Sequence, residues 1–228
     1  MRLFYRACQC VCLWTNVLLV KARCFGMRNV PATGGVLIVC NHQSFLDPPL
    51  VAIGLRREAN YLARHGLFDH RPFRWLIEHL NAFPVRQNTA DIRAIKESLR
   101  RLRAGQMLVV FPEGSRTEDG RIAPFLPGAG VIAKWARVPI VPALIDGTFQ
   151  AWPRHQLLPR TGNAILEFGP PIMPADYEPL TDQALLELLR DRLIAMQACW
   201  HSRAPARRLN DCRRRYAGNE PIPFGAAR

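Results

Sequence analysis

An uninterrupted apolar run at residues 36–40, Val-Leu-Ile-Val-Cys, constrains the fold of this chain most strongly. A run this short, preceded by Gly34-Gly35 and followed by polar residues, is typical of a strand buried on both faces. The polar segment that follows reads Asn-His-Gln-Ser-Phe-Leu-Asp, residues 41–47, and Pro48-Pro49 comes next. A buried strand that ends in His42 and Asp47 is a suitable place for a general base and the carboxylate that orients it.

The same segment has a purely structural interpretation. Asp47 before Pro48 has the pattern of a helix N-cap with proline at the first helical position, and Ser44 with Asp47 has that of a capping box. His42 would then only hydrogen-bond a loop carbonyl. Taken alone, the seven residues favour the cap. The catalytic pair also requires a turn, because residues five apart point away from each other on a helix.

Apolar runs alternate with helical patterns along the rest of the chain. The patterns predict strands at 36–40, 59–63, 82–85, 107–111, 139–145 and 164–168. They predict helices at 48–55, 72–80 and 128–137, one from Asn88 or Asp91 to Gly105, and one capped by Thr181. In the helix that stops at Gly105, a solvated face is expected to carry Arg93, Arg100, Arg101 and Arg103. This alternation predicts an α/β fold, with a mostly parallel central sheet covered by helices on both faces.

Residues 1–30 are predicted to form an amphipathic, membrane-docking segment. Fourteen residues separate Arg6 from Lys21, about 21 Å of helix, which is short of the ~30 Å hydrocarbon core. A helix lying in the membrane interface is therefore expected, with a signal peptide or an ordinary docking helix as alternatives. Its apolar stripe consists of Leu3, Ala7, Val11, Trp14 and Leu18, and the opposite side carries Arg2, Arg6, Gln9 and Asn16.

The net charge of +13 favours an anionic partner. Arginine supplies 28 of the 31 basic residues, and seven arginines lie in residues 203–228, which are predicted to be a basic tail after a catalytic domain at 31–202. An anionic membrane surface or a phosphorylated substrate fits this charge. Nucleic acid is not expected, because no basic motif interleaved with aromatic residues is present. The seven cysteines lack metal-ligand spacing, which indicates a reducing compartment and no metal site.

Three further polar segments follow predicted strands or open a helix. They are Phe83-Pro84-Val85-Arg86, Phe111-Pro112-Glu113-Gly114-Ser115-Arg116 and Phe125-Leu126-Pro127-Gly128. Open α/β sheets bind ligands at the carboxyl ends of their strands, and arginine grips phosphate bidentately. For Arg86 or Arg116 alone, a surface salt bridge is the alternative. Together with Glu113 and His42, the two arginines predict a site for an anionic substrate. Neither a Gly-x-Ser-x-Gly elbow nor a Walker loop is present.

Four motifs, in this order, resemble the four blocks of the glycerolipid acyltransferases. They are Asn41-His42-x4-Asp47, Phe83–Arg86, Phe111–Arg116 and Val138-Pro139-Ile140-Val141-Pro142. The chain is most similar to the bacterial 1-acyl-glycerol-3-phosphate acyltransferases of the PlsC type, and the resemblance covers about residues 36–171.

The resemblance implies transfer of a fatty acyl group from acyl-CoA or an acyl-carrier protein to the free hydroxyl of a lysophospholipid. The implied acceptor is 1-acyl-glycerol-3-phosphate, which would give phosphatidic acid. His42 would be the general base, Asp47 would orient it, and no acyl-enzyme would form. Acceptor binding would fall to Arg86, Glu113, Gly114, Ser115 and Arg116, with Pro142 shaping a pocket. No resident cofactor or metal is implied, and the enzyme would lie peripherally or monotopically on the cytoplasmic face of a membrane.

Three positions depart from the family pattern. The second block often carries a glycine where Asn81 or Ala82 stands here. A Lys-x-Glu-Leu pattern appears as Arg64-His65-Gly66-Leu67, and a Phe-Lys-Pro-Gly pattern has Leu126 in place of lysine. These departures bear on the acceptor rather than on His42 and Asp47, and a lyso-aminolipid acceptor is therefore an alternative. A second alternative is a non-enzymatic module held on a membrane by its charge.

Overall fold

The structure is a computed structural model that describes residues 2–86 and 91–202, without the side chains of residues 15–19. Its strands are β1 (Arg23–Phe25), β2 (Val36–Cys40), β3 (Ala59–Arg64), β4 (Ala82–Val85), β5 (Met107–Val110), β6 (Ile140–Asp146) and β7 (Ile165–Phe168). Its α-helices are α1 (Leu3–Val20), α2 (Asp47–Gly54), α3 (Arg71–His79), α4 (Ile92–Arg103), α5 (Pro127–Ala136), α6 (Thr148–Ala151), α7 (Pro174–Tyr177) and α8 (Asp182–His201). Two 3-10 helices are η1 (Met27–Asn29) and η2 (His65–Phe68).

The strands form one sheet in the order β1-β7-β6-β2-β5-β3-β4. Neighbouring strands are parallel except for β6 and β7. The predicted mostly parallel sheet is therefore confirmed. Because β2 lies between β5 and β6, the segments that follow these three strands meet at the carboxyl edge of the sheet.

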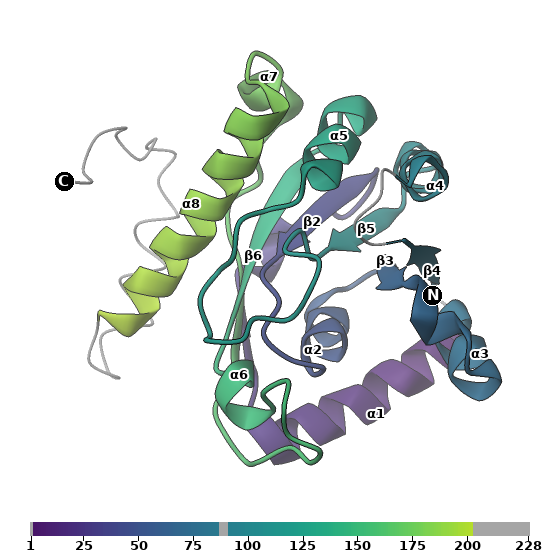
Figure 1. The fold of residues 1–228 in the computed structure, drawn as a ribbon, viewed down its shortest axis with the longest axis vertical. Helices are drawn as coiled ribbons and strands as arrows, with labels where there is room; N and C mark the ends of the chain where they lie inside the picture. The colour runs from purple at the N-terminus through teal and green to yellow at the C-terminus, as the bar shows by residue number, and fades with distance from the viewer. Residues whose placement is uncertain (1, 87–90, 203–228) are drawn as a thin grey trace.

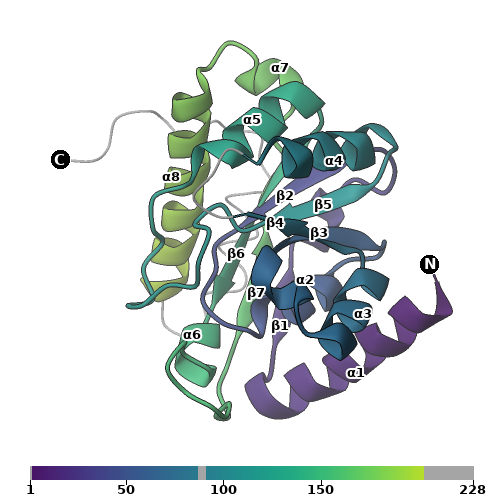
Figure 2. The ribbon, with the colours of Figure 1, turned by 45° about the vertical axis from the view of Figure 1, so that its right-hand side comes forward.

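Helices cover both faces of the sheet (Figures 1 and 2). Val36, Ile38 and Cys40 of β2 point to the face that α2 covers, and Leu37 and Val39 point to the face of α4, α5 and α8. All five residues are fully buried. A strand buried on both faces must be apolar at every position, which explains the unbroken run in the sequence.

Helix α1 packs against α2 with a polar residue inward and its apolar stripe outward. Gln9 Nε2 donates to the carbonyl oxygens of Ala52 (2.7 Å) and Leu55 (3.1 Å), which lie at the end of α2. Val11 and Trp14 are 63% and 67% exposed. The predicted helix is present, and the described members of its apolar stripe face away from the protein. Membrane docking stays a prediction. Leu18 and Asn16 lie outside the described side chains. Among the helices of the described chain, none is long and apolar enough to cross a bilayer.

The expectation of a solvated face on α4 is wrong for Arg101. Its side chain is 18% exposed, and its guanidinium donates to Asn60 Oδ1 (2.6 Å) and to the Asn81 carbonyl (2.9 Å). It also lies over the Phe83 ring, 4.3 Å from the centroid. Position 101 comes three residues after buried Ser98, so it borders the packed side of the helix. Exposed positions, as predicted, are Arg93, Arg100 and Arg103.

The other predicted elements agree with the structure within one or two residues at their ends. The sequence did not indicate β1, α6 and α7, each of which has only three or four residues. Strand β1 lies inside the predicted segment 1–30 and pairs with β7. Asn88 and the predicted tail 203–228 lie outside the described residues, and the three-part division of the chain stays a prediction.

Candidate active site

His42 and Asp47 are in direct contact at the carboxyl end of β2. His42 Nδ1 lies 2.8 Å from Asp47 Oδ2, and the Asp47 side chain is fully buried. The same oxygen accepts the backbone N–H groups of Gln43 (2.5 Å) and Ser44 (2.7 Å). An oxygen with these donors acts as an acceptor toward the imidazole too, so Nδ1 carries the proton. Nε2 is then left as the nitrogen that accepts a proton.

The helix-cap interpretation of this segment is wrong. The N-cap position of α2 is Leu46, no side chain caps it, and Asp47 is the first helical residue. The Asp47 carboxylate turns back toward the residues before the helix, where it closes the turn between β2 and α2. Ser44 Oγ donates to the Trp152 carbonyl (2.9 Å) and accepts the Leu46 N–H (3.2 Å). Ser44 is fully buried, which leaves it no access to a substrate.

The second oxygen of Asp47 is held by Thr148, a residue that the sequence did not single out. Thr148 Oγ1 donates to Asp47 Oδ1 at 2.6 Å, and both residues are fully buried. Thr148 begins α6 directly after Gly147, whose φ is +90°. A Cβ at Gly147 would lie 2.0 Å from the Asn163 carbonyl oxygen, so only glycine fits there. The signal available in the sequence was position alone, since Thr148 follows a buried strand.

Asn41 and Gln43 fix the loop on either side of His42. Asn41 extends the pairing of β2 with β6 through its side chain, which accepts the Ile145 N–H (2.7 Å) and donates to the Ile145 carbonyl (2.8 Å). Gln43 Oε1 accepts the Phe149 N–H at 3.3 Å. Both amides are buried. Both residues lie in the segment around His42. The sequence did not indicate that their side chains would hold this loop in place.

Glu113 comes next to His42 because β5 is a neighbour of β2 in the sheet. Glu113 Oε1 accepts the backbone N–H of His42 (2.7 Å), and Oε2 accepts that of Ala123 (2.9 Å). Burial raises the pKa of the Glu113 carboxyl, and these two hydrogen bonds act in the opposite direction. The backbone of His42 is thus fixed by the third block. The Phe111 ring stacks on the imidazole, with the ring centroids 4.3 Å apart.

Arg116 lies over the loop that carries His42. Its guanidinium carbon is 3.4 Å from the centroid of the Phe45 ring. Nη1 is buried and has no hydrogen-bond partner among the described residues. Burial lowers the pKa of the guanidinium, and the nearby Arg154 lowers it further. A buried donor without an acceptor, close to a second cation, favours binding of an anion.

The turn between Glu113 and Arg116 depends on Gly114. Its φ is +72°, and a Cβ there would lie 2.5 Å from Leu126 Cδ1. The left-handed backbone conformation favours glycine, and a Cβ would also require the Leu126 side chain to shift. Ser115 is exposed beside it. Leu126, which replaces the lysine of the family pattern, packs against this turn.

Arg86 stays farther from His42 than the other predicted residues. It follows β4, the edge strand, and β4 is separated from β5 by β3. Strands lie about 4.8 Å apart, so about 14 Å separates β4 from β2 across the sheet. Arg86 is exposed, and its backbone N–H donates to Asp91 Oδ2 at 2.9 Å.

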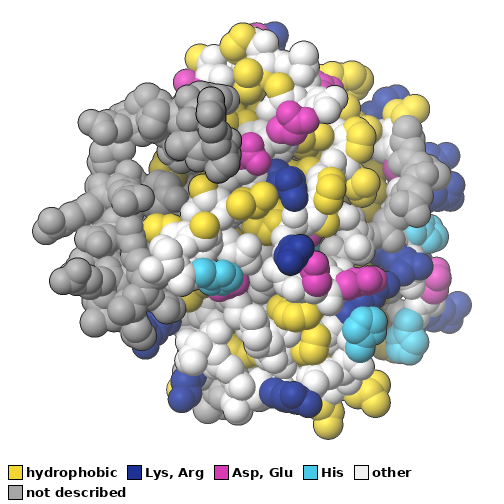
Figure 3. Space-filling view, turned by 60° about the vertical axis from the view of Figure 1, so that its left-hand side comes forward, with side chains coloured by type: hydrophobic (Ala, Val, Ile, Leu, Met, Phe, Trp, Pro, Cys, Tyr) yellow, Lys and Arg dark blue, Asp and Glu magenta, His cyan; other side chains and the backbone are white. Residues whose placement is uncertain are grey.

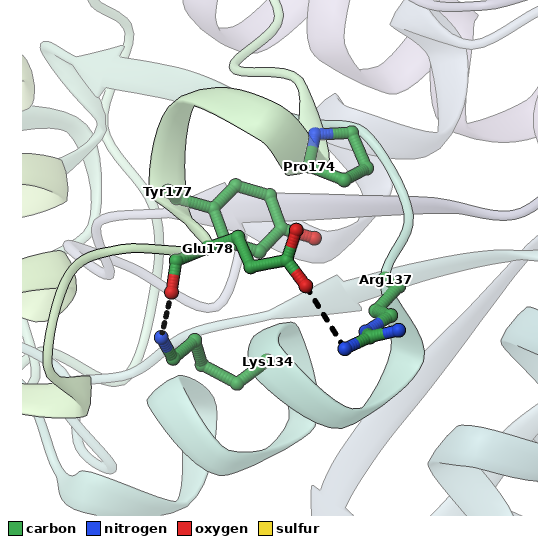
Figure 4. Close-up of a pocket in the computed structure, with 5 residues that line it drawn as sticks. All are labelled: Lys134, Arg137, Pro174, Tyr177 and Glu178. Carbon is green, nitrogen blue, oxygen red and sulfur yellow. Dashed lines mark hydrogen bonds and ion pairs between the residues drawn. The ribbon is translucent and has the colours of Figure 1, made fainter.

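A small hollow of about 150 Å³ lies at the opposite, amino edge of the sheet. Figure 4 shows the side chains that line it, with Lys134 donating to the Glu178 carbonyl (2.8 Å) and Arg137 paired with the Glu178 carboxylate (2.9 Å). Both basic groups bind Glu178, and they lie in α5 or directly after it rather than at the strand ends that carry His42. No group of three possible metal ligands occurs among the described residues.

Residues 21–146, more than half of the chain, match the family model described as Acyltransferase. The chain belongs to the acyltransferase family. This assignment decides against a non-enzymatic module. On the face shown in Figure 3, some Lys and Arg side chains lie beside acidic ones, and others, at the lower edge of the view, do not.

Curated relatives of this acyltransferase are bacterial and plant proteins. It is 28% identical over 170 residues to the 1-acyl-sn-glycerol-3-phosphate acyltransferase of Bacillus subtilis (strain 168), covering 74% of this chain and 82% of that protein. It is 32% identical over 145 residues to the protein of that name from Cocos nucifera, covering 62% of this chain and 47% of that protein. The chain therefore spans about half the length of the coconut relative.

The fold of the acyltransferase resembles a solved structure. The crystal structure of the 1-acyl-sn-glycerophosphate acyltransferase PlsC from Thermotoga maritima superposes with a TM-score of 0.74 at 24% identity, over 85% of this chain and 80% of that one. Thr148 lies beyond the stretch that the family model matches.

Proposed function

We propose that this acyltransferase moves a fatty acyl group from a thioester to the free hydroxyl of 1-acyl-glycerol-3-phosphate, giving phosphatidic acid. One observation carries the proposal, the contact of His42 Nδ1 with a buried, fully hydrogen-bonded Asp47. This arrangement leaves Nε2 as a base at the carboxyl edge of a parallel sheet, where such folds bind substrates. The names of the relatives supply the acceptor class.

The reaction needs one general base and no covalent enzyme intermediate. The acceptor hydroxyl attacks the thioester carbonyl carbon while Nε2 of His42 takes the hydroxyl proton. Asp47 stabilises the imidazolium that forms. The tetrahedral intermediate then collapses, the carbon–sulfur bond breaks, and the thiolate takes the proton from the imidazolium. The products are the diacylated lipid and the free thiol of the donor.

An acyl-enzyme on Ser44 is disfavoured by its surroundings. Ser44 Oγ already donates to the Trp152 carbonyl, and the residue is fully buried. A serine nucleophile needs both an adjacent base and access to the thioester. Direct transfer between two bound substrates fits the site better.

Arg116 is proposed to hold the acceptor phosphate. Its buried Nη1 has no partner in the described chain, and a phosphate oxygen would supply one. Arg86 is exposed at the end of β4, where it would contact the same acceptor from farther away. Acyl-CoA and an acyl-carrier protein are both proposed as donors. A lyso-aminolipid acceptor is the alternative, motivated by Leu126 where the family pattern has a basic residue.

Peripheral docking on the cytoplasmic face of an anionic membrane is proposed through α1. The outward side of this helix carries Leu3, Val11 and Trp14, which are 85%, 63% and 67% exposed. At its N-terminal end, the rings of Phe4 and Trp75 pack edge-on with their centroids 5.3 Å apart. An apolar face of this size, without a covering element in the described chain, suits the interface of a bilayer.

A transfer assay over a panel of acceptors tests the proposal. The purified enzyme would be given lysophosphatidic acid, other lysophospholipids and a lyso-aminolipid, each with palmitoyl-CoA and with palmitoyl-acyl-carrier protein. Thiol release and mass spectrometry of the lipid would report transfer. Preferred acylation of lysophosphatidic acid is expected. Preferred acylation of the lyso-aminolipid would show that the proposed acceptor is wrong. Absence of transfer to every lipid tested would contradict the proposed reaction.

A further inference from the structure

A closed surface loop at residues 151–160, here called the leucine loop, presents two adjacent apolar side chains to solvent. Leu157 is 93% exposed and Leu158 is 78% exposed. The ends of the loop are joined, since the Arg160 N–H donates to the Ala151 carbonyl at 2.7 Å. Inside it, Trp152 Nε1 donates to the Gln156 carbonyl (2.9 Å). A loop with pinned ends and two leucines at its tip is built to present them rather than to bury them.

The leucine loop lies beside the C-terminal end of α1 (Figures 1 and 2). Just after the loop, the Ala164 N–H donates to the Val20 carbonyl (2.9 Å), and the Arg23 N–H donates to the Ala164 carbonyl (3.0 Å). The opposite, N-terminal end of α1 carries the Phe4–Trp75 contact. The leucine loop therefore lies near the C-terminal end of α1, at the end away from α3.

The loop also touches the active site. The Trp152 carbonyl accepts from Ser44 Oγ (2.9 Å), and the Trp152 and Phe45 rings lie 5.5 Å apart. Phe45 in turn lies under the guanidinium of Arg116. Contacts of Trp152 with Ser44 and Phe45, and of Phe45 with Arg116, thus link the loop to the proposed acceptor site.

We propose that Leu157 and Leu158 insert into an anionic phospholipid bilayer, with Arg154 and Arg160 at the level of the headgroups. Both arginines are exposed and flank the two leucines in sequence. Leucines flanked by cations match the layered chemistry of an anionic membrane interface. This inference rests on the proposed function, because the acceptor lipid would then enter from the bilayer beside Phe45 and Arg116.

Vesicle binding tests the insertion without any acyl transfer. The Leu157→Ser/Leu158→Ser double variant and wild type would be sedimented with vesicles of phosphatidylcholine and phosphatidylglycerol. About a tenfold or greater loss of binding is expected, because burial of a leucine side chain changes a partition constant by that order. The matched control is Trp135→Ser, which removes a 60% exposed apolar side chain from α5, and unchanged binding is expected. Unchanged binding of the double variant, or an equal loss in the control, would overturn the proposal.

A second measurement keeps an apolar side chain at the tip of the loop and detects insertion directly. A Leu157→Trp variant in the presence of brominated phospholipid vesicles should show additional fluorescence quenching relative to wild type, and absence of that quenching would contradict insertion. Acylation of a short-chain acceptor below its micellar concentration should be equal in wild type and the double serine variant. If vesicle binding is unchanged and transfer falls only with the acyl-carrier-protein donor, the loop binds that protein and not the membrane.

A different observation, the hydrogen bond from Thr148 to Asp47, carries a second inference. Of the two carboxylate oxygens, Oδ2 receives the His42 ring and two backbone N–H groups, and Oδ1 receives Thr148 Oγ1 at 2.6 Å. We infer that Thr148 is a positioning residue, which fixes the rotation of the carboxylate so that Oδ2 faces the imidazole. The inference rests on the proposed role of His42.

Thr148→Val and Thr148→Ser separate positioning from packing. Valine keeps the shape without the hydroxyl, and kcat is expected to fall about tenfold with little change in KM, as for one hydrogen bond to a charged group. Serine keeps the hydroxyl and should restore kcat. A Thr148→Val enzyme with normal kcat would contradict the inference.

Discussion

The loop around His42 and the turn around Arg116 are neighbours in space but differ in how completely their polar groups are paired. The Asp47 carboxylate receives the His42 ring, two backbone N–H groups and the Thr148 hydroxyl. By contrast, Nη1 of Arg116 is buried without a partner among the described residues. In the first region every Asp47 oxygen is paired, and in the second a hydrogen-bond donor of Arg116 is left for a ligand.

The difference separates two demands on an enzyme of this kind. A general base must be held in one tautomer and orientation before substrate arrives, and a fully paired network does this. A group that recognises an anion must keep unused donors until the anion arrives. Glu113 connects the regions, since it belongs to the third block and holds the backbone of His42.

Replacing the base should have the largest effect of any substitution in the paired region. His42→Ala removes Nε2, and kcat is expected to fall about 10²–10⁴-fold in the transfer assay, the usual value of a general base. KM for the acceptor should change little, because Arg116 is untouched. Circular dichroism provides the folding control. Near-normal transfer by folded His42→Ala protein would mean that the paired network has a purely structural purpose.

Asp47→Asn sharpens the same comparison by removing charge while keeping shape. The amide oxygen can take the place of Oδ2, and the amide nitrogen can donate to Thr148 Oγ1, since a hydroxyl also accepts. The protein should therefore fold, and kcat should fall about 10²-fold because the imidazolium loses its counter-charge. Asp119→Asn, at an exposed aspartate of the loop between β5 and α5, is the matched control. Equal kcat in Asp47→Asn and wild type would show that the negative charge of Asp47 is not needed for catalysis.

The paired region was only partly predictable from sequence. His42 and Asp47 were found because a turn after a buried strand brings them together. Thr148 comes from 101 residues farther along the chain, and no local pattern indicates that a hydroxyl will meet that carboxylate. Asn41 was part of a quoted motif, but its pairing with Ile145 depends on β6 lying beside β2. Long-range pairings of this kind follow from strand order, which one sequence does not reveal.

The sheet itself was more predictable than the contacts on its edge. Runs such as 36–40 and 107–110 are apolar at every position because both faces of the sheet are covered. Short elements such as β1 and α6 have too few residues for a periodic pattern to appear. Arg101 was misplaced because helical spacing alone does not show that Phe83 and Asn60 lie within its reach.

The unpaired region should respond through substrate binding. Arg116→Ala is expected to lower kcat/KM for lysophosphatidic acid about 10–100-fold, mostly through KM, as for hydrogen bonds to a charged group. The same substitution should matter less for a lyso-lipid without a phosphate monoester. Arg121→Ala is the matched control, since that arginine is 89% exposed five residues farther along the chain. A loss confined to kcat would mean that Arg116 acts in the chemical step together with His42 rather than in binding the acceptor.

Glu113→Gln, at the residue that joins the two regions, should show a smaller effect that depends on pH. Burial raises the pKa of Glu113. A carboxyl group with a raised pKa in the folded state stabilises the protein fully below its unfolded pKa, and that contribution is lost as pH rises through the folded pKa. Glutamine does not titrate, and it turns an N–H group toward one of two backbone donors. It should lower the free energy of unfolding by about 1–3 kcal/mol under acidic conditions.

The gap in unfolding free energy between wild type and Glu113→Gln should therefore narrow from about pH 4 to about pH 8, because wild type loses stability over that window. Urea unfolding at both pH values measures it. Glu118→Gln, at a glutamate that is 75% exposed on the same segment, should show no such trend. A gap that widens with pH would mean that the N–H groups of His42 and Ala123 stabilise ionised Glu113 more than burial opposes it. Glu113 would then be an ionised, fully hydrogen-bonded carboxylate like Asp47, and it would belong to the paired region. Arg116 would be the part of the third block that stays unpaired.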